Sequence, residues 1–148
     1  MNKKQVQQKV LQNGKPLALS KFTWCEKTVT FSSDEDDLVF AFQNIEGVKI
    51  ISKDWSTQTA GYNSTQTAGY GSTQTAGAYS TQTAGYNSTQ KAGYGSTQTA
   101  GARSTQTSWN GSTHFIDDGC QVATGYGSII YVNGNDCAII NRNVFELI

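Results

Sequence analysis

Small polar and β-branched side chains alternate through the middle of the chain in a pattern that repeats every eight residues. Seven octads follow one another over residues 56–111, and most of them read Ser-Thr-Gln-Thr-Ala-Gly followed by two variable residues. Five residues with Thr at alternate positions make a strand of ordinary length, and Gly with the two variable residues makes a corner. The pattern predicts an all-β protein, a β-solenoid (β-helix) with 16-residue coils made of two octapeptide strands.

A tract this rich in Ser, Thr and Gly is also compatible with a disordered, low-complexity segment. The strict period, the alternation of Thr with other residues and the fixed place of Gly favour the solenoid. At the sixth slot of the octad, Gly is expected to supply the positive φ that a corner needs.

Alternation along a strand assigns the slots of the octad to two faces. With Thr at the second and fourth slots pointing outward, Ser, Gln and Ala at the first, third and fifth slots point inward. Counting by eights into the flanks places Val48 and Ile50, and also Cys120 and Val122, in the first and third slots. Apolar residues therefore fall where the interior is predicted. Buried Gln amides can be satisfied if each one donates to the next rung of the stack.

Both flanks hold larger apolar side chains than the repeats and are interpreted as caps. Solenoids need atypical terminal units, because open end strands pair with other chains. Asn13-Gly14 indicates a hairpin, and Asp117-Asp118 is placed at a corner. Further strands are predicted over residues 21–24, 28–32, 38–42, 128–132, 137–140 and 144–148. We divide the chain into an N-terminal capping segment (1–55), the repeat solenoid (56–111) and C-terminal coils with a cap (112–148).

Composition excludes several classes of function. The net charge is zero and no apolar stretch is long enough to span a bilayer, so neither nucleic acid nor a membrane is an expected partner. The N-terminus lacks the apolar core of a signal peptide, so a cytoplasmic location is expected for the chain as expressed. Three cysteines without CxxC spacing and a single His predict no metal, no cofactor and no enzymatic activity. Trp55 and Trp109, at the two ends of the array, are expected to seal the core rather than to bind sugars.

The repeats resemble a known family. The motif AGYGSTQTA, found at Ala68–Ala76 and Ala92–Ala100, is similar to the signature repeat of bacterial ice-nucleation proteins, and the match covers about residues 55–108. The corners also vary with a three-octad rhythm, as they do in that family. The resemblance implies a water-organising array, which in the parent family acts at the bacterial outer surface. It also implies that Arg103 belongs to the arginine-bearing repeats used in multimer assembly.

The chain departs from this family in three ways. Every octad begins STQT or STQK, whereas the family commonly carries a different strand on the second face. The Tyr rows at the corners are interrupted by Ala78 and Ala102, which puts a continuous Tyr ladder in doubt. The flanks are instead similar to the ends of short bacterial or phage β-solenoids with the same period of eight. Our hypothesis is a chimera, an engineered protein in which a repeat array was grafted between borrowed caps.

The outward threonines are the candidate site, and ice or ordered water is the predicted partner. Thr is a good outward strand residue in any sheet, but an ordinary solvated face mixes charged residues, and residues 56–111 contain only Lys91 and Arg103. The predicted ice-binding residues are Thr57, Thr59, Thr65, Thr67, Thr73, Thr75, Thr81, Thr83, Thr89, Thr97, Thr99, Thr105 and Thr107. The candidates for self-association are Tyr62, Tyr70, Tyr86, Tyr94 and Arg103.

Several alternatives stay open at this point. A purely structural or adhesive solenoid without ice activity explains the caps equally well. Ice nucleation needs a template comparable in size to the critical nucleus, so a short array is expected to bind ice or slow its growth, as an antifreeze does, and to nucleate poorly. The oligomeric state, the handedness of the coil and the choice of active face are not decided by the sequence.

Overall fold

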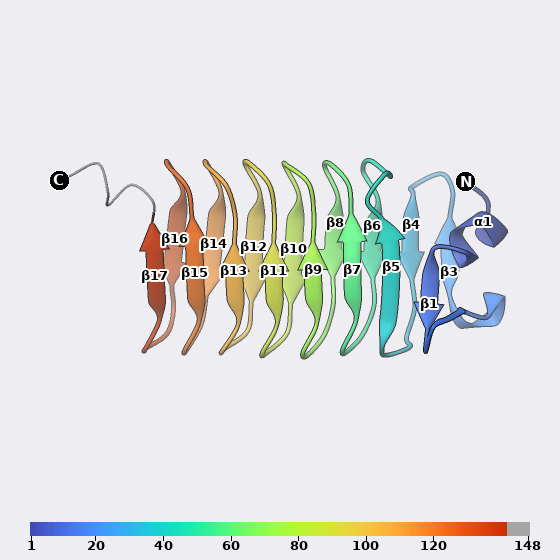
Figure 1. Ribbon diagram of the computed structural model, residues 1–148, viewed down its shortest axis with the longest axis horizontal. Helices are drawn as coiled ribbons and strands as arrows, with labels where there is room; N and C mark the ends of the chain where they lie inside the picture. Colours follow the sequence, from blue (N-terminus) through green and yellow to red (C-terminus); the bar gives the residue numbers. More distant parts are fainter. Residues whose placement is uncertain (142–148) are drawn as a thin grey trace.

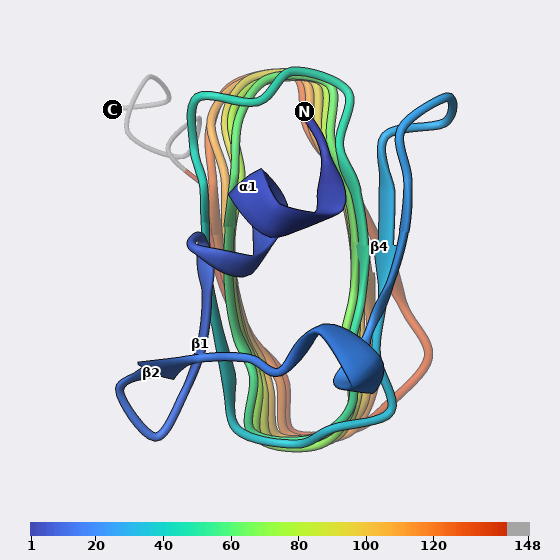
Figure 2. The ribbon, with the colours of Figure 1, turned by 90° about the vertical axis from the view of Figure 1, so that its right-hand side faces the viewer.

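The computed structural model describes residues 1–141 and shows a β-solenoid built of two parallel stacks of strands (Figure 1). The chain passes from one stack to the other at each corner. Viewed down its axis, the solenoid is flattened and its successive coils nearly superimpose (Figure 2). The predicted fold class is therefore confirmed. The strand predicted over residues 144–148 lies outside the described residues.

The two stacks are named sheet A and sheet B. Sheet A contains β2 (Lys15–Pro16), β1 (Val10–Gln12), β5 (Leu38–Phe42), β7 (Thr57–Ala60), β9 (Thr73–Thr75), β11 (Thr89–Lys91), β13 (Thr105–Thr107), β15 (Gln121–Thr124) and β17 (Ala138–Asn141), in that order. Sheet B contains β3 (Thr23–Cys25), β4 (Thr30–Ser32), β6 (Lys49–Ile51), β8 (Thr65–Thr67), β10 (Thr81–Ala84), β12 (Thr97–Ala100), β14 (Thr113–Ile116) and β16 (Ile129–Val132).

Strand register confirms the coil of 16 residues. In sheet A, Thr57 pairs with Thr73, and in sheet B Thr65 pairs with Thr81, both in parallel. The same step continues to the end of the repeats. The coil is longer in the N-terminal flank, where Val39 pairs with Thr57. The uniform step therefore belongs to the octads, and the flanks adapt to it.

The interior is lined by the first, third and fifth slots, as the alternation predicts. All seven third-slot Gln side chains have 0% exposure, and the first-slot Ser and fifth-slot Ala side chains of the repeats are also buried. Each Gln amide donates to the Gln one coil earlier, for example Gln74 Nε2 to Gln58 Oε1 at 3.0 Å. The same nitrogen also donates across the core to a carbonyl of the other sheet, Thr83 O, at 2.9 Å. The predicted amide ladder exists, and it also ties the two sheets together.

Serine forms a second buried ladder. The hydroxyl of Ser72 accepts a hydrogen bond from the backbone N–H of Ser56, 3.2 Å away, and the pattern recurs every coil up to Ser128 in sheet B. These contacts satisfy N–H groups that would otherwise be buried without a partner, which costs about 1–3 kcal/mol each. A core with few large apolar groups is thus held together by repeated hydrogen bonds.

The sixth-slot Gly has a different role from the one predicted. The positive φ at each corner of the repeats belongs to the eighth slot, which holds residues such as Asn63 (55°), Tyr79 (55°) and Arg103 (57°). The sixth-slot Gly is required because coils approach each other closely there. A Cβ at Gly77 would lie 2.9 Å from the backbone nitrogen of Tyr62 in the preceding coil.

This difference predicts two separable effects of Ala substitution. Gly77→Ala is expected to destabilise the fold by about 3 kcal/mol, because the backbones of two coils must move apart. Gly47→Ala is the control, since its Cβ would meet nothing within 4 Å and only its φ of +66° is strained, which costs about 1–2 kcal/mol. Urea unfolding of both variants measures the comparison. A larger loss for Gly47→Ala would contradict the close-approach explanation.

The N-terminal end is closed by the chain's first elements. A five-residue helix, α1 (Lys3–Gln7), lies across the opening of the first coil (Figure 2) and buries Val6. β1 and β2 form the hairpin predicted at Asn13-Gly14. The phenylalanines of β4 and β5 and neighbouring apolar side chains form the main apolar core. The helix was missed, although Asn2 and Gln5 form a capping box that marks its start.

The tryptophans at the two ends of the array do not seal the core. Trp55 is 53% exposed and Trp109 is 68% exposed, so that expectation is wrong. Both lie at or beside corners, where the strand alternation that points alternate residues inward has ended. At the C-terminal end a small cluster of Ile116, Cys120 and Val122 replaces the polar interior. Within residues 1–141, no helix has the length and apolar character needed to cross a bilayer.

Candidate functional site: the outward threonine lattice

Two flat threonine surfaces are formed by the second and fourth slots of the octads. In sheet A, Thr57, Thr73, Thr89 and Thr105 make one row, and Thr59, Thr75, Lys91 and Thr107 make the other. In sheet B the rows are Thr65, Thr81, Thr97 and Thr113, and Thr67, Thr83 and Thr99. All these side chains are partly or fully exposed. The structure thus brings the predicted threonines together on two opposite faces of the solenoid.

The spacing of each lattice follows from sheet geometry. Neighbouring rungs of a sheet are about 4.8 Å apart, and residues two apart on a strand are about 6.6 Å apart. Every node carries one methyl and one hydroxyl group, and β-branching restricts rotation about χ1. The in-register parallel pairing repeats this unit without a slip through all octads. Each face is therefore a rectangular grid of identical groups.

The interior keeps this grid rigid. Third-slot Gln lies between the two outward threonines of every strand, and its amide bonds both along the stack and across to the other sheet. A local shift of one strand would break bonds to its neighbours in both directions. The position of each outward hydroxyl is therefore set by buried contacts rather than by its own exposed side chain.

The two faces differ in continuity. On sheet A, the exposed Lys91 interrupts the fourth-slot row between Thr75 and Thr107. On sheet B, the row of Thr67, Thr83 and Thr99 carries no charge. It ends at the exposed aromatic side chain of Phe115, which pairs with Thr99. Sheet B therefore offers the longer uninterrupted lattice.

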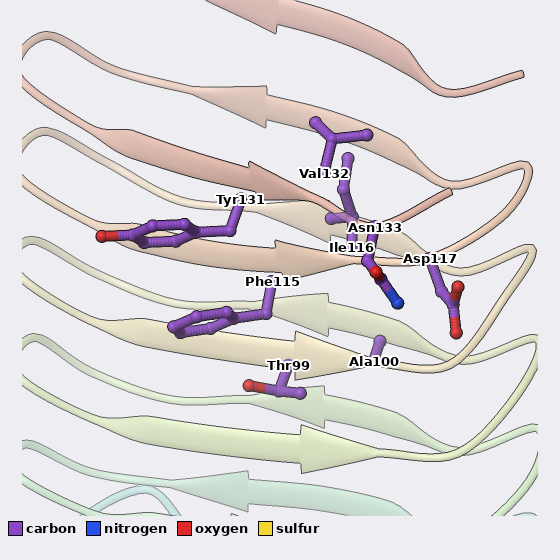
Figure 3. Close-up of a pocket in the computed structure, with 8 residues that line it drawn as sticks. All are labelled: Thr99, Ala100, Phe115, Ile116, Asp117, Tyr131, Val132 and Asn133. Carbon is purple, nitrogen blue, oxygen red and sulfur yellow. The ribbon is translucent and has the colours of Figure 1, made fainter. Parts of the chain in front are cut away.

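A groove borders the C-terminal end of the sheet B lattice (Figure 3). Phe115 and Tyr131 extend side by side from β14 and β16, with stacked rings whose centroids are 4.9 Å apart. Together with Thr99, Asp117 and other residues of these coils, they line a space of about 520 Å³. The stacked rings mark where the threonine pattern stops.

The corner tyrosines form continuous ladders, contrary to the interruption expected at Ala78. Tyr79 reaches into the place left open by Ala78, and its ring centroid lies 5.5 Å from both Tyr62 and Tyr94. At the other corner Tyr70 and Tyr86 stack at 5.6 Å. This second ladder begins at Trp55, 4.8 Å from Tyr70, and ends at Arg103, whose guanidinium lies 5.8 Å from the Tyr86 ring.

The three-octad rhythm of the corners now has a steric explanation. A large eighth-slot residue folds its side chain over the eighth slot of the next coil, and that slot holds Gly. The Trp55 ring covers Gly71, and the Tyr79 ring covers Gly95, where an added Cβ would lie 2.6 Å and 2.9 Å from ring atoms. Arg103 stands over Gly119 in the same way. Large residues at this slot therefore recur every 24 residues, each followed 16 residues later by Gly.

The single histidine ends the Gln ladders, a role that the sequence analysis did not find. His114 occupies the third slot in sheet B, beside Gln98, and is fully buried. Its Nδ1 lies 2.9 Å from Gln106 Oε1, which only accepts, so Nδ1 carries the proton. Its Nε2 therefore accepts from the Ser108 hydroxyl, at 2.8 Å. Because the ring turns toward Gln106, Gln98 Oε1 is left without a hydrogen-bond partner among the described residues.

Burial makes the stability of the fold sensitive to acid. It lowers the pKa of His114 from 6.5 to about 4. Between these values the unfolded chain binds a proton that the folded chain does not, so stability decreases as the pH falls. From pH 7 to pH 5 the free energy of unfolding is expected to drop by about 2 kcal/mol through this group.

Urea unfolding at several pH values measures this dependence. His114→Gln is the control, because it keeps a third-slot amide and removes the titrating group. It moves the unpaired carbonyl from Gln98 to Gln106, so little change is expected at pH 7. An equally steep loss between pH 7 and pH 5 in this variant would show that His114 is not the cause.

Within the described part of the chain, no three His, Cys, Asp or Glu side chains cluster in a way that could hold a metal ion. Comparisons with protein-family models, curated proteins and solved structures found no match. The threonine lattice is thus the most regular chemical feature of the surface. Its function must be argued from its geometry.

Proposed function

We propose that the protein binds and orders water as ice through its threonine lattice. The observation that carries this proposal is the unbroken register of outward Thr pairs on a flat, untwisted sheet. A hydroxyl can hold one water molecule, while the adjacent methyl restricts where neighbouring waters lie. A single contact of this kind has little effect. A rigid grid acts on many waters together, so that one ordered layer is favoured over the disordered liquid.

Sheet B is proposed as the main ice-binding face. Its two rows carry only threonine from Thr65 to Thr113, whereas Lys91 places a flexible ammonium group in the middle of sheet A. An ammonium orders its own hydration shell, and its long side chain covers neighbouring positions of the grid. The same charge would therefore weaken whichever face carries it.

A reciprocal pair of substitutions tests the proposal. Thr83 and Lys91 occupy the same fourth slot on opposite sheets, in the middle of their rows. Thr83→Lys is expected to remove most of the ice-shaping activity, because it breaks the continuous lattice of sheet B. Lys91→Thr is expected to increase activity, because it makes sheet A continuous as well. Ice-crystal habit and growth rate in a cooled stage measure both effects.

Folding must be preserved for this comparison to count. Both substituted positions are exposed, so circular dichroism and unfolding curves are expected to match those of the parent chain within about 0.5 kcal/mol. Ice growth that is unaffected by the parent chain and by both variants would contradict the proposal. The solenoid would then be a structural or adhesive element.

A further inference from the structure

Two of the three cysteines lie on adjacent rungs of the solenoid. Strands β15 and β17 pair so that Gln121 is opposite Ala138, and the Ala138 N–H donates to Cys120 O at 2.9 Å. Cys120 and Cys137, the residues before this pair, are therefore neighbours across the ladder. Cys120 is fully buried, and Cys137 is half-buried and packs against the same small apolar cluster.

The period of the sequence hides this proximity. A count of sixteen from Cys120 leads to Asp136, not to Cys137. The last described coil contains one additional residue, and Asp136 takes up the left-handed corner conformation with φ 56°. The insertion moves Cys137 into the first slot, directly over Cys120.

Both thiols point the same way. Cys120 Sγ donates to Gly101 O at 3.5 Å, and Cys137 Sγ donates to Asp117 O at 3.1 Å, each a corner carbonyl of the preceding coil. First-slot serines make the equivalent contact, as Ser80 does with Gly61. The two cysteines thus continue the buried serine row, with backbones one rung, about 4.8 Å, apart. This spacing lies within the Cα separations of about 4.4–6.8 Å that disulfides bridge.

We propose that Cys120 and Cys137 form a reversible disulfide that locks the C-terminal coil of the solenoid. The oxidant is a small-molecule disulfide such as oxidised glutathione. The more accessible Cys137 thiolate attacks one of its sulfurs, forming a mixed disulfide and releasing one thiol. The Cys120 thiolate then attacks Cys137 Sγ and releases the second thiol. Two protein thiols are oxidised, and one external disulfide is reduced to two thiols.

The consequence is a redox-controlled end to the solenoid. The bond would join β15 and β17 covalently and close the coil between them. End coils open more readily than central ones, because they have a neighbour on one side only. In the oxidised protein, exchange of the Ala138 amide hydrogen is expected to slow on the order of a hundredfold, the effect expected from closing a loop of this length.

The test uses the Cys25→Ser chain, because Cys25 is exposed on β3 and competes for the oxidant. Hydrogen bonds from Thr28 hold the pKa of the Cys25 thiol below its usual value, which makes it the more reactive competitor. The folded protein is equilibrated in a glutathione buffer rich in the disulfide form, and free thiols are then alkylated after unfolding. Chymotrypsin, which cuts after Tyr126 and Tyr131, separates the two cysteines for peptide mass analysis.

The expected result is loss of both free thiols and a linked pair of peptides that dithiothreitol separates. As a positional control, Cys137→Ser combined with Asp136→Cys places the thiol where the octad count alone would put it. This variant is expected to stay unlinked, because that position forms the corner. Complete alkylation of Cys120 and Cys137 would overturn the proposal. So would a bond that forms only in urea or only between chains.

Discussion

A chain that carries residues 56–103 twice is expected to freeze supercooled droplets at a higher temperature than the present chain. The inserted segment contains six octads, or three complete coils, so it extends both threonine faces without changing the register. The corner rule is also kept, because Arg103 is again followed one coil later by Gly71 and later by Gly119. The larger grid covers more of the critical nucleus and therefore lowers the barrier to its formation.

The droplet experiment needs a control for size alone. A second extended chain carries Lys at the fourth slots of the inserted segment, which repeats the chemistry of Lys91 on every added rung. It has the same length and coil number, and it is expected to freeze droplets no better than the parent chain. Equal freezing temperatures for the two extended chains would show that threonine does not act as the template.

Gln82→Ala is expected to cause the largest loss of stability among single substitutions in the array, about 3 kcal/mol. The Gln82 amide donates to Gln66 Oε1 at 2.9 Å and to Lys91 O at 3.0 Å, and it accepts from Gln98 at 2.8 Å. Removing it leaves buried polar groups without a partner in both directions along sheet B. Each such group costs about 1–3 kcal/mol, and the vacated volume adds to the loss.

Gln121→Ala is the matched control for this prediction. Gln121 stands at an outward slot on β15 and is exposed, so its removal is expected to change the free energy of unfolding by less than about 0.5 kcal/mol. Urea unfolding at pH 7 measures both variants. Similar losses for Gln82→Ala and Gln121→Ala would contradict the view that the amide ladder stabilises the core.

The effect of Gln82→Ala also bears on the proposed function. Thr81 and Thr83 flank this residue on the outward face, and their positions depend on the amide bonds beneath them. Loss of the ladder would therefore disturb the sheet B lattice without changing any exposed group. Stability and ice growth measured on one variant can thus show whether rigidity of the grid matters.

The corner ladders are a second surface whose regularity depends on the octads. The rings of Tyr62, Tyr79 and Tyr94 line one corner, and those of Trp55, Tyr70 and Tyr86 line the other. The residues proposed for self-association, Tyr62, Tyr70, Tyr86, Tyr94 and Arg103, all belong to these ladders. Their role in assembly stays a prediction, which sedimentation of the parent chain against Arg103→Ala would test.

Most of the repeat architecture could be predicted from the sequence, because it depends on local rules applied many times. Alternation along a strand decides that Gln82 points inward and that Thr81 and Thr83 point outward, whatever the rest of the fold does. The sixteen-residue coil follows from pairing two octads, and the amide ladder follows from stacking identical coils. The same rules placed Val48, Ile50, Cys120 and Val122 in the core and identified the threonine rows.

Only the tertiary structure decided the features that depend on contacts between coils. The sixth-slot Gly is required by the backbone one coil away, and the Tyr79 ring fills a gap left by its own neighbour Ala78. His114 ends a ladder by turning toward the opposite sheet, and one inserted residue brings Cys137 over Cys120. Strand alternation describes one strand at a time, whereas these arrangements result from how neighbouring coils fill the space between them.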